Sequence, residues 1–336
     1  MRPGSFLLLI AAWASAAAAQ TEQPPAAAGQ LSPQTAAPVL ATPAAPAQAP
    51  LPWTEAAARE TLAEVRAAAN EGLDPADYGE AALAAALAAG DMDAVATAAQ
   101  SAWMALARDY AAGRTPESAR IGWKSPLPRS DPDWLRAKLS DGLAAGAPGQ
   151  ALRALLPTHP HYAALKEALR TAPAGPDRAR IRANLDRWRW MPRLLGTSYM
   201  FANVPSFELD LWLDETLAAR HRIIVGATKT PTPQFSTVAT AVIINPPWIL
   251  PQSIIAESVG GLIRRSPATA RAKGYRWTQT AEGLWVTQLP GAGNSLGTLK
   301  IEMPNPYAIY FHDTPNKALF ARPALPMTEA TSGKLF

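Results

Sequence analysis

The chain has 336 residues, of which 48% are hydrophobic, and a formal net charge of +4. This length is enough for about two domains. The small charge excess favours anionic surroundings, such as a cell envelope, without resembling a basic nucleic-acid-binding module. The sequence contains no cysteine, so disulfides are excluded and a packed core must stabilise the fold.

The N-terminus has the pattern of a secretory signal peptide over residues 1–19. Arg2 supplies the positive charge, Phe6 to Trp13 the apolar stretch, and Ala17 to Ala19 a small-residue cleavage site. A membrane anchor is the alternative, but the apolar stretch is shorter than the roughly 20 residues that a spanning helix needs. We therefore expect an exported, periplasmic protein with no transmembrane segment after cleavage.

Residues 20–52 are rich in Ala, Pro, Gln and Thr and nearly uncharged. This composition predicts an extended, semi-rigid linker, either a tether or a disordered leader.

Residues 53–170 are expected to form a helical domain. Thr54 can cap the first helix, and the segment Gly72 to Pro75 should end it, with Asp74 or Asp77 capping the next. Apolar residues at helical spacing predict further helices over 91–112, 131–145 and 161–169.

The pattern changes after residue 181. A mainly-β domain is expected over 181–322, beginning with an Arg/Trp-rich helix over 181–193. A divergent tail follows over 323–336. The predicted strands cover 199–204, 207–213, 221–227, 237–245, 298–303 and 307–312. The fold class is therefore α+β, with helices first and strands second.

Several motifs in order resemble one family. They are GLDPADYGEAAL (72–83), ARDYAAGR (107–114) and LPTHPHYAALKEAL (156–169) in the helical domain, and IRANLDRWRWMPR (181–193), RIIVGATKTPTPQFS (222–236), VIINPPWILPQSI (242–254), NSLGTLKIEMPN (294–305) and YFHDTPNKALFAR (310–322) after it. Together they are similar to the L,D-transpeptidases, in the larger periplasmic form of Gram-negative bacteria with a helical scaffold domain. The resemblance covers most of residues 53 to 322.

The resemblance implies peptidoglycan cross-linking by acyl transfer. In the family a cysteine attacks a carbonyl in a tetrapeptide stem, the terminal D-amino acid leaves, and an amine of a second stem resolves the thioester to form a 3-3 cross-link. His312 matches the histidine that takes the thiol proton; without the resemblance, a structural role would be the preferred interpretation. Tyr310 and Asp313 are candidate substrate-binding residues. The implied partners are stem peptides, with no cofactor, metal or nucleic acid.

The family's nucleophile has no counterpart in this sequence. The cysteine turn should follow His312 by somewhat under two dozen residues, where Ser332-Gly333-Lys334 is the nearest match. We assign no nucleophile role to Ser332, because a hydroxyl needs stronger activation than a thiol. We therefore expect a C-terminally incomplete catalytic domain, from a shifted reading frame or a truncated gene. Two alternatives stay open: a catalytically dead wall-binding or regulatory paralogue, and a non-functional product.

Two other kinds of site are not supported. Gly293 to Gly297 satisfies G-x-S-x-G, but a nucleophile elbow around Ser295 needs a strand before it and a helix after it, and a strand is expected to follow. The four histidines, at 159, 161, 221 and 312, have no metal-ligand spacing.

Overall fold

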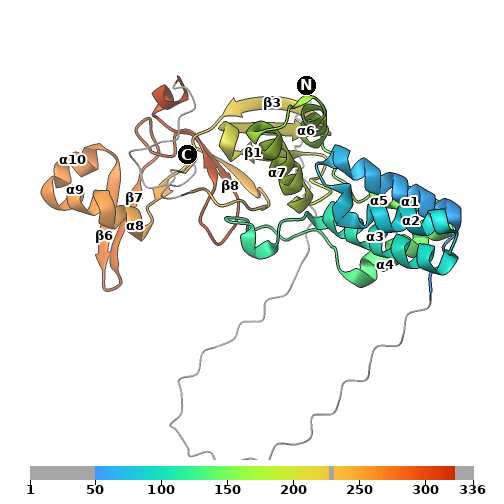
Figure 1. Ribbon diagram of the computed structural model, residues 1–336. Helices are drawn as coiled ribbons and strands as arrows, with labels where there is room; N and C mark the ends of the chain where they lie inside the picture. Colours follow the sequence, from blue (N-terminus) through green and yellow to red (C-terminus); the bar gives the residue numbers. More distant parts are fainter. Residues whose placement is uncertain (1–49, 227–230, 322–336) are drawn as a thin grey trace, which may run out of the picture. The chain divides into compact units, whose positions relative to one another are not determined.

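A computed structural model describes residues 50–226 and 231–321. The first part of the described chain is helical, and all of its described strands lie in the second part together with a few short helices (Figure 1), which confirms the predicted α+β class. The expected signal peptide, almost all of the linker and the tail lie outside the described residues. The described chain divides into a helical unit of residues 50–111 and 129–185, and a β-rich unit of 112–128 and the residues from 186 onward.

Several elements of the helical unit begin at side-chain caps. Its elements are α1 (Glu55–Ala67), η1 (Ala68–Glu71), η2 (Pro75–Tyr78), α2 (Glu80–Ala89), α3 (Met92–Ala112), α4 (Pro132–Ala144), α5 (Pro148–Arg153), α6 (Pro160–Thr171) and the first part of α7 (Pro176–Trp190). Thr54 accepts a hydrogen bond from the Ala57 N–H, and Asp74 accepts one from the Ala76 N–H. The predicted cap at Thr54 is therefore present, and of the two alternatives for the next element Asp74 is the one that caps, at the start of η2.

The core of the helical unit surrounds α3. Trp103 is 0% exposed, and its indole N–H donates to the Pro148 carbonyl over 2.9 Å. The buried Tyr78 hydroxyl donates to Asp109 over 2.8 Å. Tyr162 donates to Glu71 over 2.6 Å, and Glu71 also pairs with Lys166. Buried polar groups are thus hydrogen-bonded to one another, which removes much of the cost of burying them.

The segment from 112 to 128 belongs to the β-rich unit, although in sequence it lies between two parts of the helical unit. Its only regular element among the described residues is η3 (Glu117–Ala119). Trp123 forms a parallel bridge with Gln234, and the Lys124 N–H donates to the Gln234 carbonyl over 2.7 Å. The physical reason for this grouping is a set of hydrogen bonds to the end of α7.

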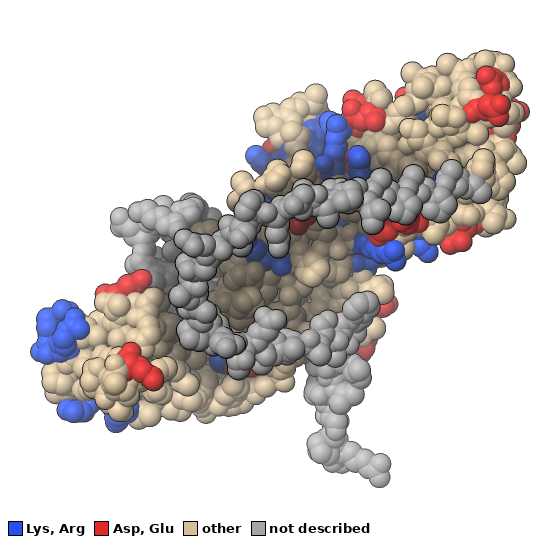
Figure 2. All heavy atoms as spheres, turned by 90° about the horizontal axis from the view of Figure 1, so that it is seen from below, with Lys and Arg blue, Asp and Glu red and all other residues tan. Residues whose placement is uncertain are grey.

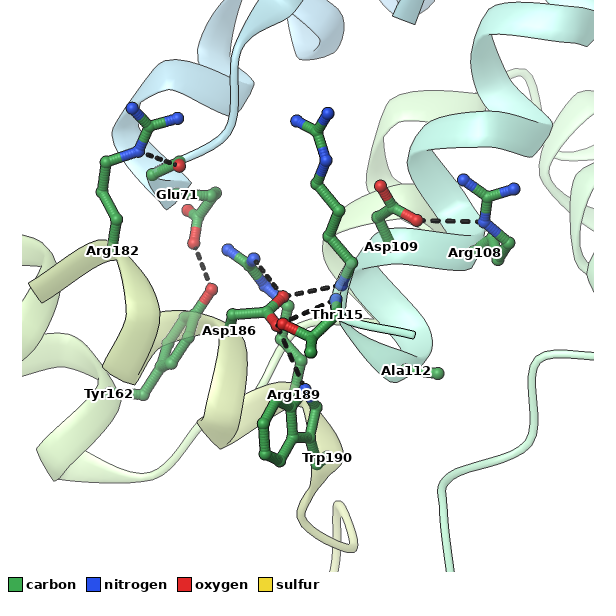
Figure 3. Close-up of polar contacts among 12 residues, drawn as sticks. Glu71, Arg108, Asp109, Ala112, Thr115, Tyr162, Arg182, Asp186, Arg189 and Trp190 are labelled. Atoms are coloured by element: carbon green, nitrogen blue, oxygen red, sulfur yellow. Dashed lines mark hydrogen bonds and ion pairs between the residues drawn. The ribbon is translucent and has the colours of Figure 1, made fainter. Parts of the chain in front are cut away.

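Asp186, on α7, receives these hydrogen bonds (Figure 3). Its carboxylate accepts from the Arg114 N–H over 2.6 Å, and from the Thr115 N–H and hydroxyl over 3.1 and 2.6 Å. The Trp190 indole N–H donates to it over 3.2 Å. Gly113 has φ +81°, and a Cβ there would lie 2.6 Å from Trp190 Nε1, so only glycine fits this turn.

Arg120 completes this cluster from the other side. Its guanidinium donates to the Thr115 and Ala112 carbonyls, each over 2.8 Å, and lies 4.9 Å from the centre of the Trp190 ring. Burial lowers the pKa of Arg120, and the nearby Asp186 carboxylate opposes that effect. The backbone turn after α3 is therefore held by charged groups from two different parts of the chain.

Three small sheets form the rest of the β-rich unit. The first is β1 (Tyr199–Asn203), β2 (Glu208–Leu213) and β3 (Thr216–Arg222), in that order and antiparallel, with η4 (Val204–Ser206) between the first two. The second has the order β4 (Ala241–Ile244), β8 (Leu299–Glu302) and β9 (Phe311–His312). The third has the order β5 (Trp248–Ile249), β7 (Gly283–Gln288) and β6 (Tyr275–Thr280). The short η6 (Lys317–Ala321) follows β9.

The strand predicted over 221–227 is wrong in its position. The observed β3 begins at Thr216, directly after a two-residue turn in which Asp214 and Glu215 have φ 49° and 61°. A turn with two positive φ angles matches the twist of a hairpin, but it usually has the sequence Asn-Gly, which is not present here. β3 is also mostly exposed and has no alternation of apolar residues. The sequence therefore showed neither the usual turn signal nor the usual strand signal.

A helical insertion in the third sheet was not predicted. It contains α8 (Gln252–Ile254), the π-helical turn η5 (Ile255–Val259), α9 (Gly260–Arg265) and α10 (Pro267–Ala272). These helices pack on the β6–β7 hairpin and share a core with it that includes Ile255, Val259, Tyr275 and Val286. α8, η5 and α9 run without a break, but the π-helical turn η5 interrupts the period of 3.6 residues, and α10 is too short to show a period.

We predict that Asp186→Asn lowers the free energy of unfolding by about 2–3 kcal/mol, because hydrogen bonds to a charged group contribute about that much and the amide would place N–H against N–H. Urea denaturation followed by tryptophan fluorescence measures the change. Asp177→Asn is the control, since Asp177 pairs with Arg180 on the surface and its side chain is 79% exposed; it should leave the midpoint unchanged. Equal midpoints for the two variants would contradict the role given to Asp186.

The helical unit should also fold by itself when its real boundaries are respected. A protein of residues 50–185, with 112–128 replaced by a Gly/Ser linker of equal length, keeps the buried Leu185 and the bond from Arg182 to Gly72. We expect a helical circular dichroism spectrum and a cooperative melt. A spectrum of unordered chain would show that the unit depends on the rest of the protein.

Candidate active site around His312

His312 lies at the end of β9, at the edge of the second sheet. β9 pairs with the central strand β8, and the register places Lys300 opposite His312 and Ile301 opposite Phe311. Directly paired residues point to the same face of a sheet, so the side chains of Lys300 and His312 share one face. Of the strand predicted over 307–312, only Phe311 and His312 are in strand conformation.

The residues before β9 form a turn held by Asn305. Its side-chain amide donates to the Met303 and Ile309 carbonyls over 2.5 and 2.6 Å, and its side-chain oxygen accepts from the Ile309 N–H over 3.2 Å. Ala308 has φ 52°, which interrupts an extended strand. This local bonding is why the apolar run from Tyr307 does not form a long strand.

Asp313 fixes the backbone directly after His312. Its N–H donates to the Leu299 carbonyl over 2.8 Å. Its carboxylate accepts from the N–H and hydroxyl of Thr298 over 3.1 and 3.0 Å, and forms an ion pair with Lys317. The carboxylate thus connects the loop before β8, through Thr298, with the segment after β9, through Lys317.

Gly297 is required by the position of this carboxylate. It has φ +62°, and a Cβ at this position would lie 2.5 Å from Asp313 Oδ2. A side chain here would be strained in backbone conformation and would also displace the carboxylate.

The environment of Asp313 keeps it ionised. Burial raises its pKa, but hydrogen bonds from Lys317, from the Thr298 and Thr314 N–H groups and from the Thr298 hydroxyl outweigh burial, so that the pKa is far below its ordinary value. Donors that favour the charged form act in this direction.

The hydrogen bonding of His312 defines its tautomer. Nδ1 lies 2.5 Å from the Asp313 carbonyl oxygen. Because a carbonyl can only accept, Nδ1 carries the hydrogen, and Nε2 is the basic nitrogen of the neutral ring. In this tautomer a backbone acceptor orients Nδ1, and Nε2 is the nitrogen that would take a proton in general-base catalysis.

Tyr310 and Lys300 lie beside His312. The ring centres of Tyr310 and His312 are 5.6 Å apart, and Lys300 Nζ lies 4.1 Å from the centre of the Tyr310 ring. Lys300 also pairs with Glu302 over 2.5 Å. Burial raises the pKa of Tyr310, so its hydroxyl stays protonated at neutral pH and can donate a hydrogen bond.

Sequence reasoning named three of these residues and missed others. It singled out His312, Tyr310 and Asp313; the His312 ring contacts the Tyr310 ring and the Asp313 carbonyl. It missed Lys300, Thr298, Gly297 and Lys317, which hold or flank them. The one usable signal was the position of Thr298 and Lys300 in the motif at 294–305; their pairing with β9 depends on the sheet register.

The G-x-S-x-G segment has no elbow geometry. It connects β7 to β8, so a strand follows it, as the sequence predicted. Asn294 is 1% exposed and donates to the Pro246, Gln288 and Leu289 carbonyls over 3.0–3.2 Å. The segment is a loop held by a buried amide, and the context that a serine nucleophile needs is lacking.

Residues 50–226 and 231–321 hold no group of three or more His, Asp or Glu side chains that could bind a metal ion. None of the helices in this part of the chain is long and apolar enough to cross a membrane. The predicted tail, including Ser332 to Lys334, lies outside it.

Comparisons with known proteins match two family models to successive parts of the chain. A family model described as a scaffold domain matches residues 46–169, and the YkuD model, described as an L,D-transpeptidase catalytic domain, matches residues 197–333. A curated protein of Haemophilus influenzae named "Putative L,D-transpeptidase" is 31% identical over 139 residues, which is 37% of this chain and 28% of that protein. This chain therefore aligns with less than a third of that relative's length.

We predict that Asp313→Asn destabilises the protein at neutral pH and does so less as the pH falls. A depressed carboxyl pKa contributes stability that is complete above the unfolded value, about 4, and is lost as the pH falls through the folded value. Urea denaturation of both proteins between about pH 7 and pH 3 should show the difference shrinking below about pH 4.

Asp214→Asn is the matched control, because Asp214 is an exposed aspartate in the β2–β3 turn. Its effect should be small and nearly the same over this pH range. A difference for Asp313→Asn that stays constant down to pH 3 would contradict the hydrogen-bonding account of Asp313.

Proposed function

Because the chain belongs to the L,D-transpeptidase family and carries the scaffold domain, we propose that it acts on peptidoglycan stem peptides by acyl transfer. The observation that carries this proposal is the orientation of His312, whose Nδ1 donates to the Asp313 carbonyl and whose Nε2 is therefore the basic nitrogen. The proposed substrate is a tetrapeptide stem, and the proposed product is a 3-3 cross-link.

In this mechanism His312 takes the proton of an attacking thiol. An ordinary thiol has a pKa of about 8.5 and is mostly protonated at neutral pH, so a base must act on it. The thiolate adds to a stem carbonyl and the terminal D-amino acid leaves with a proton, which gives a thioester. An amine of a second stem then attacks this thioester, forms the new amide and releases the thiol.

The neighbouring residues have two proposed roles. Asp313 was a candidate substrate-binding residue, but its carboxylate is used by Thr298 and Lys317. We assign it a positioning role, because it fixes the backbone that orients His312. Tyr310 keeps the role of substrate-binding residue, and Lys300 joins it, since an ammonium and a phenol on one face suit the carboxylates of a stem peptide.

The thiol itself is not supplied by these 336 residues, which contain no cysteine. This observation favours a second candidate function: binding of stem peptides without acyl transfer, as a wall-binding or regulatory protein. The loss of a covalent nucleophile typically costs on the order of a millionfold in kcat. The two candidates therefore differ in chemistry at the same site rather than in ligand.

The proposed setting is the periplasm. The support for it is the signal-peptide pattern of residues 1–19 together with a substrate that belongs to the cell wall. The proposed action needs no cofactor, since acyl transfer between peptides is a nucleophilic substitution.

We predict that the chain as given forms no covalent adduct with a carbapenem, whereas a chimaera does. In the chimaera, residues up to Arg322 are followed by the cysteine-containing C-terminal segment of an active family member. Intact mass spectrometry measures the adduct. Within the chimaera, His312→Gln should slow acylation by about a hundredfold or more, the usual contribution of a general base.

The control is His221→Gln in the same chimaera, because His221 is an exposed histidine on β3. It should acylate at the parent rate. Equal rates for the two variants would remove His312 as the base, and an adduct on the unaltered chain would reveal another nucleophile. Saturable binding of a tetrapeptide stem by the unaltered chain, with no turnover, would support the binding function.

A further inference from the structure

The helical unit contains a polar pocket that the acyl-transfer mechanism does not use. Its volume is about 220 Å³. It lies where the turn between η1 and η2 meets the end of α6 and one face of α7. The residues that line it are Ala69, Gly72, Leu73, Asp74, Pro75, Leu169, Arg178 and Arg182. All of them belong to the helical unit, so the pocket is a property of that unit alone.

Arg182 is held in the pocket by one of its nitrogens. Nε donates to the Gly72 carbonyl over 2.6 Å, and Figure 3 shows the two terminal nitrogens on the far side of the guanidinium. Gly72 has φ +78°, and a Cβ there would lie 3.2 Å from Arg182 Cγ. The glycine thus permits both the turn and the close passage of the arginine stem.

Arg178 is one helical turn earlier on α7 and is held in the same way. Its Nη1 donates to the Leu169 and Ala172 carbonyls over 2.6 and 2.9 Å, at the C-terminal end of α6. A guanidinium has further N–H donors on its other nitrogens. Residues four apart lie on one face of a helix, so both guanidinium groups are fixed on the same side with donors remaining.

The charges in the pocket are not neutralised by one another. Among the described residues, neither Arg178 nor Arg182 forms an ion pair with a carboxylate, and Asp74 pairs with no cation. Asp74 uses Oδ1 to accept the Ala76 N–H over 3.1 Å as a helix cap. By contrast Arg180, on another face of the same helix, pairs with Asp177 over 3.0 Å. Two guanidinium groups and one carboxylate therefore line one pocket as separate charges.

We propose that this pocket binds the zwitterionic head of an α-amino acid. The carboxylate of the ligand would be held by Arg178 and Arg182, because a guanidinium fork matches the geometry of a carboxylate. The ammonium would be held by Asp74. A simple anion satisfies the arginines but leaves Asp74 as a repulsive neighbour, so the third charge is what selects a zwitterion over a phosphate or a plain carboxylate.

Ligands are titrated into the full chain, and binding is measured by isothermal titration calorimetry or by changes in the NMR chemical shifts of backbone amides. Alanine supplies the whole head, propionate lacks the ammonium, and inorganic phosphate is an anion alone. Nε-acetyllysine carries the same head on a long side chain, as a residue linked through its side chain would. We expect alanine or Nε-acetyllysine to bind at least about tenfold more tightly than propionate or phosphate, a preference of about 1.4 kcal/mol or more.

The Nε-acetyllysine and alanine arms distinguish a side-chain-linked head from a free amino acid. Tighter binding of Nε-acetyllysine identifies the linked form, and equal or tighter binding of alanine the free form. Both outcomes support the pocket as a zwitterion site.

Three variants connect this binding to the pocket. Arg182→Gln should weaken alanine binding at least about tenfold, while Arg180→Gln, the matched control, leaves it unchanged. Asp74→Asn keeps a good helix cap, so the protein stays folded, and it should bring alanine down to the affinity of propionate. Thermal melts verify that each variant is folded.

Four results would overturn the proposal. They are no saturable binding of either amino-acid probe, equal binding of alanine and propionate by the unaltered chain, an unchanged preference in Asp74→Asn, and equal losses in Arg180→Gln and Arg182→Gln.

Discussion

The carboxylate of Asp186 is the interaction on which the arrangement of the chain around it depends. It accepts hydrogen bonds from the backbone of Arg114 and Thr115, more than 70 residues away in sequence. These hydrogen bonds join the chain segment after α3 to the residues at which the β-rich unit resumes. Within that unit the segment pairs with the backbone of Gln234. A buried charge satisfied by several N–H donors can do this because each donor would otherwise lose its hydrogen bond to water.

Asp313 has a similar place in the candidate active site. Its side-chain carboxylate contacts Thr298 before β8 and Lys317 after β9. The backbone carbonyl of the same residue orients His312. The position of the catalytic candidate is therefore determined by a neighbour that is itself fixed by two other segments. Such support is what allows a histidine to keep one tautomer and one orientation. On the face shown in Figure 2, acidic and basic side chains are interspersed among a largely uncharged surface.

The two candidate binding regions use charge differently. Around His312 the charged groups have carboxylate or ammonium partners, as Lys300 has Glu302 and Asp313 has Lys317. These pairs hold the side chains in place, and the Lys300 ammonium has further N–H donors beyond the one that Glu302 accepts. In the pocket of the helical unit, Arg178 and Arg182 are anchored through backbone carbonyls instead. Their charge is then available to a ligand, because a neutral carbonyl orients a guanidinium without neutralising it.

The sequence by itself determined the α+β class and the helix caps at Thr54 and Asp74, and it predicted His312, Tyr310 and Asp313 as site residues. These depend on local signals: periodicity, capping residues, and one motif of adjacent residues. Tertiary structure alone decided where β3 begins, how the insertion between β5 and β6 folds, and which residues support His312. The β3 hairpin has an Asp-Glu turn and an exposed strand. Lys300 lies opposite His312 because β8 pairs with β9. Contacts of this kind join residues that are distant in sequence, and no local pattern records them.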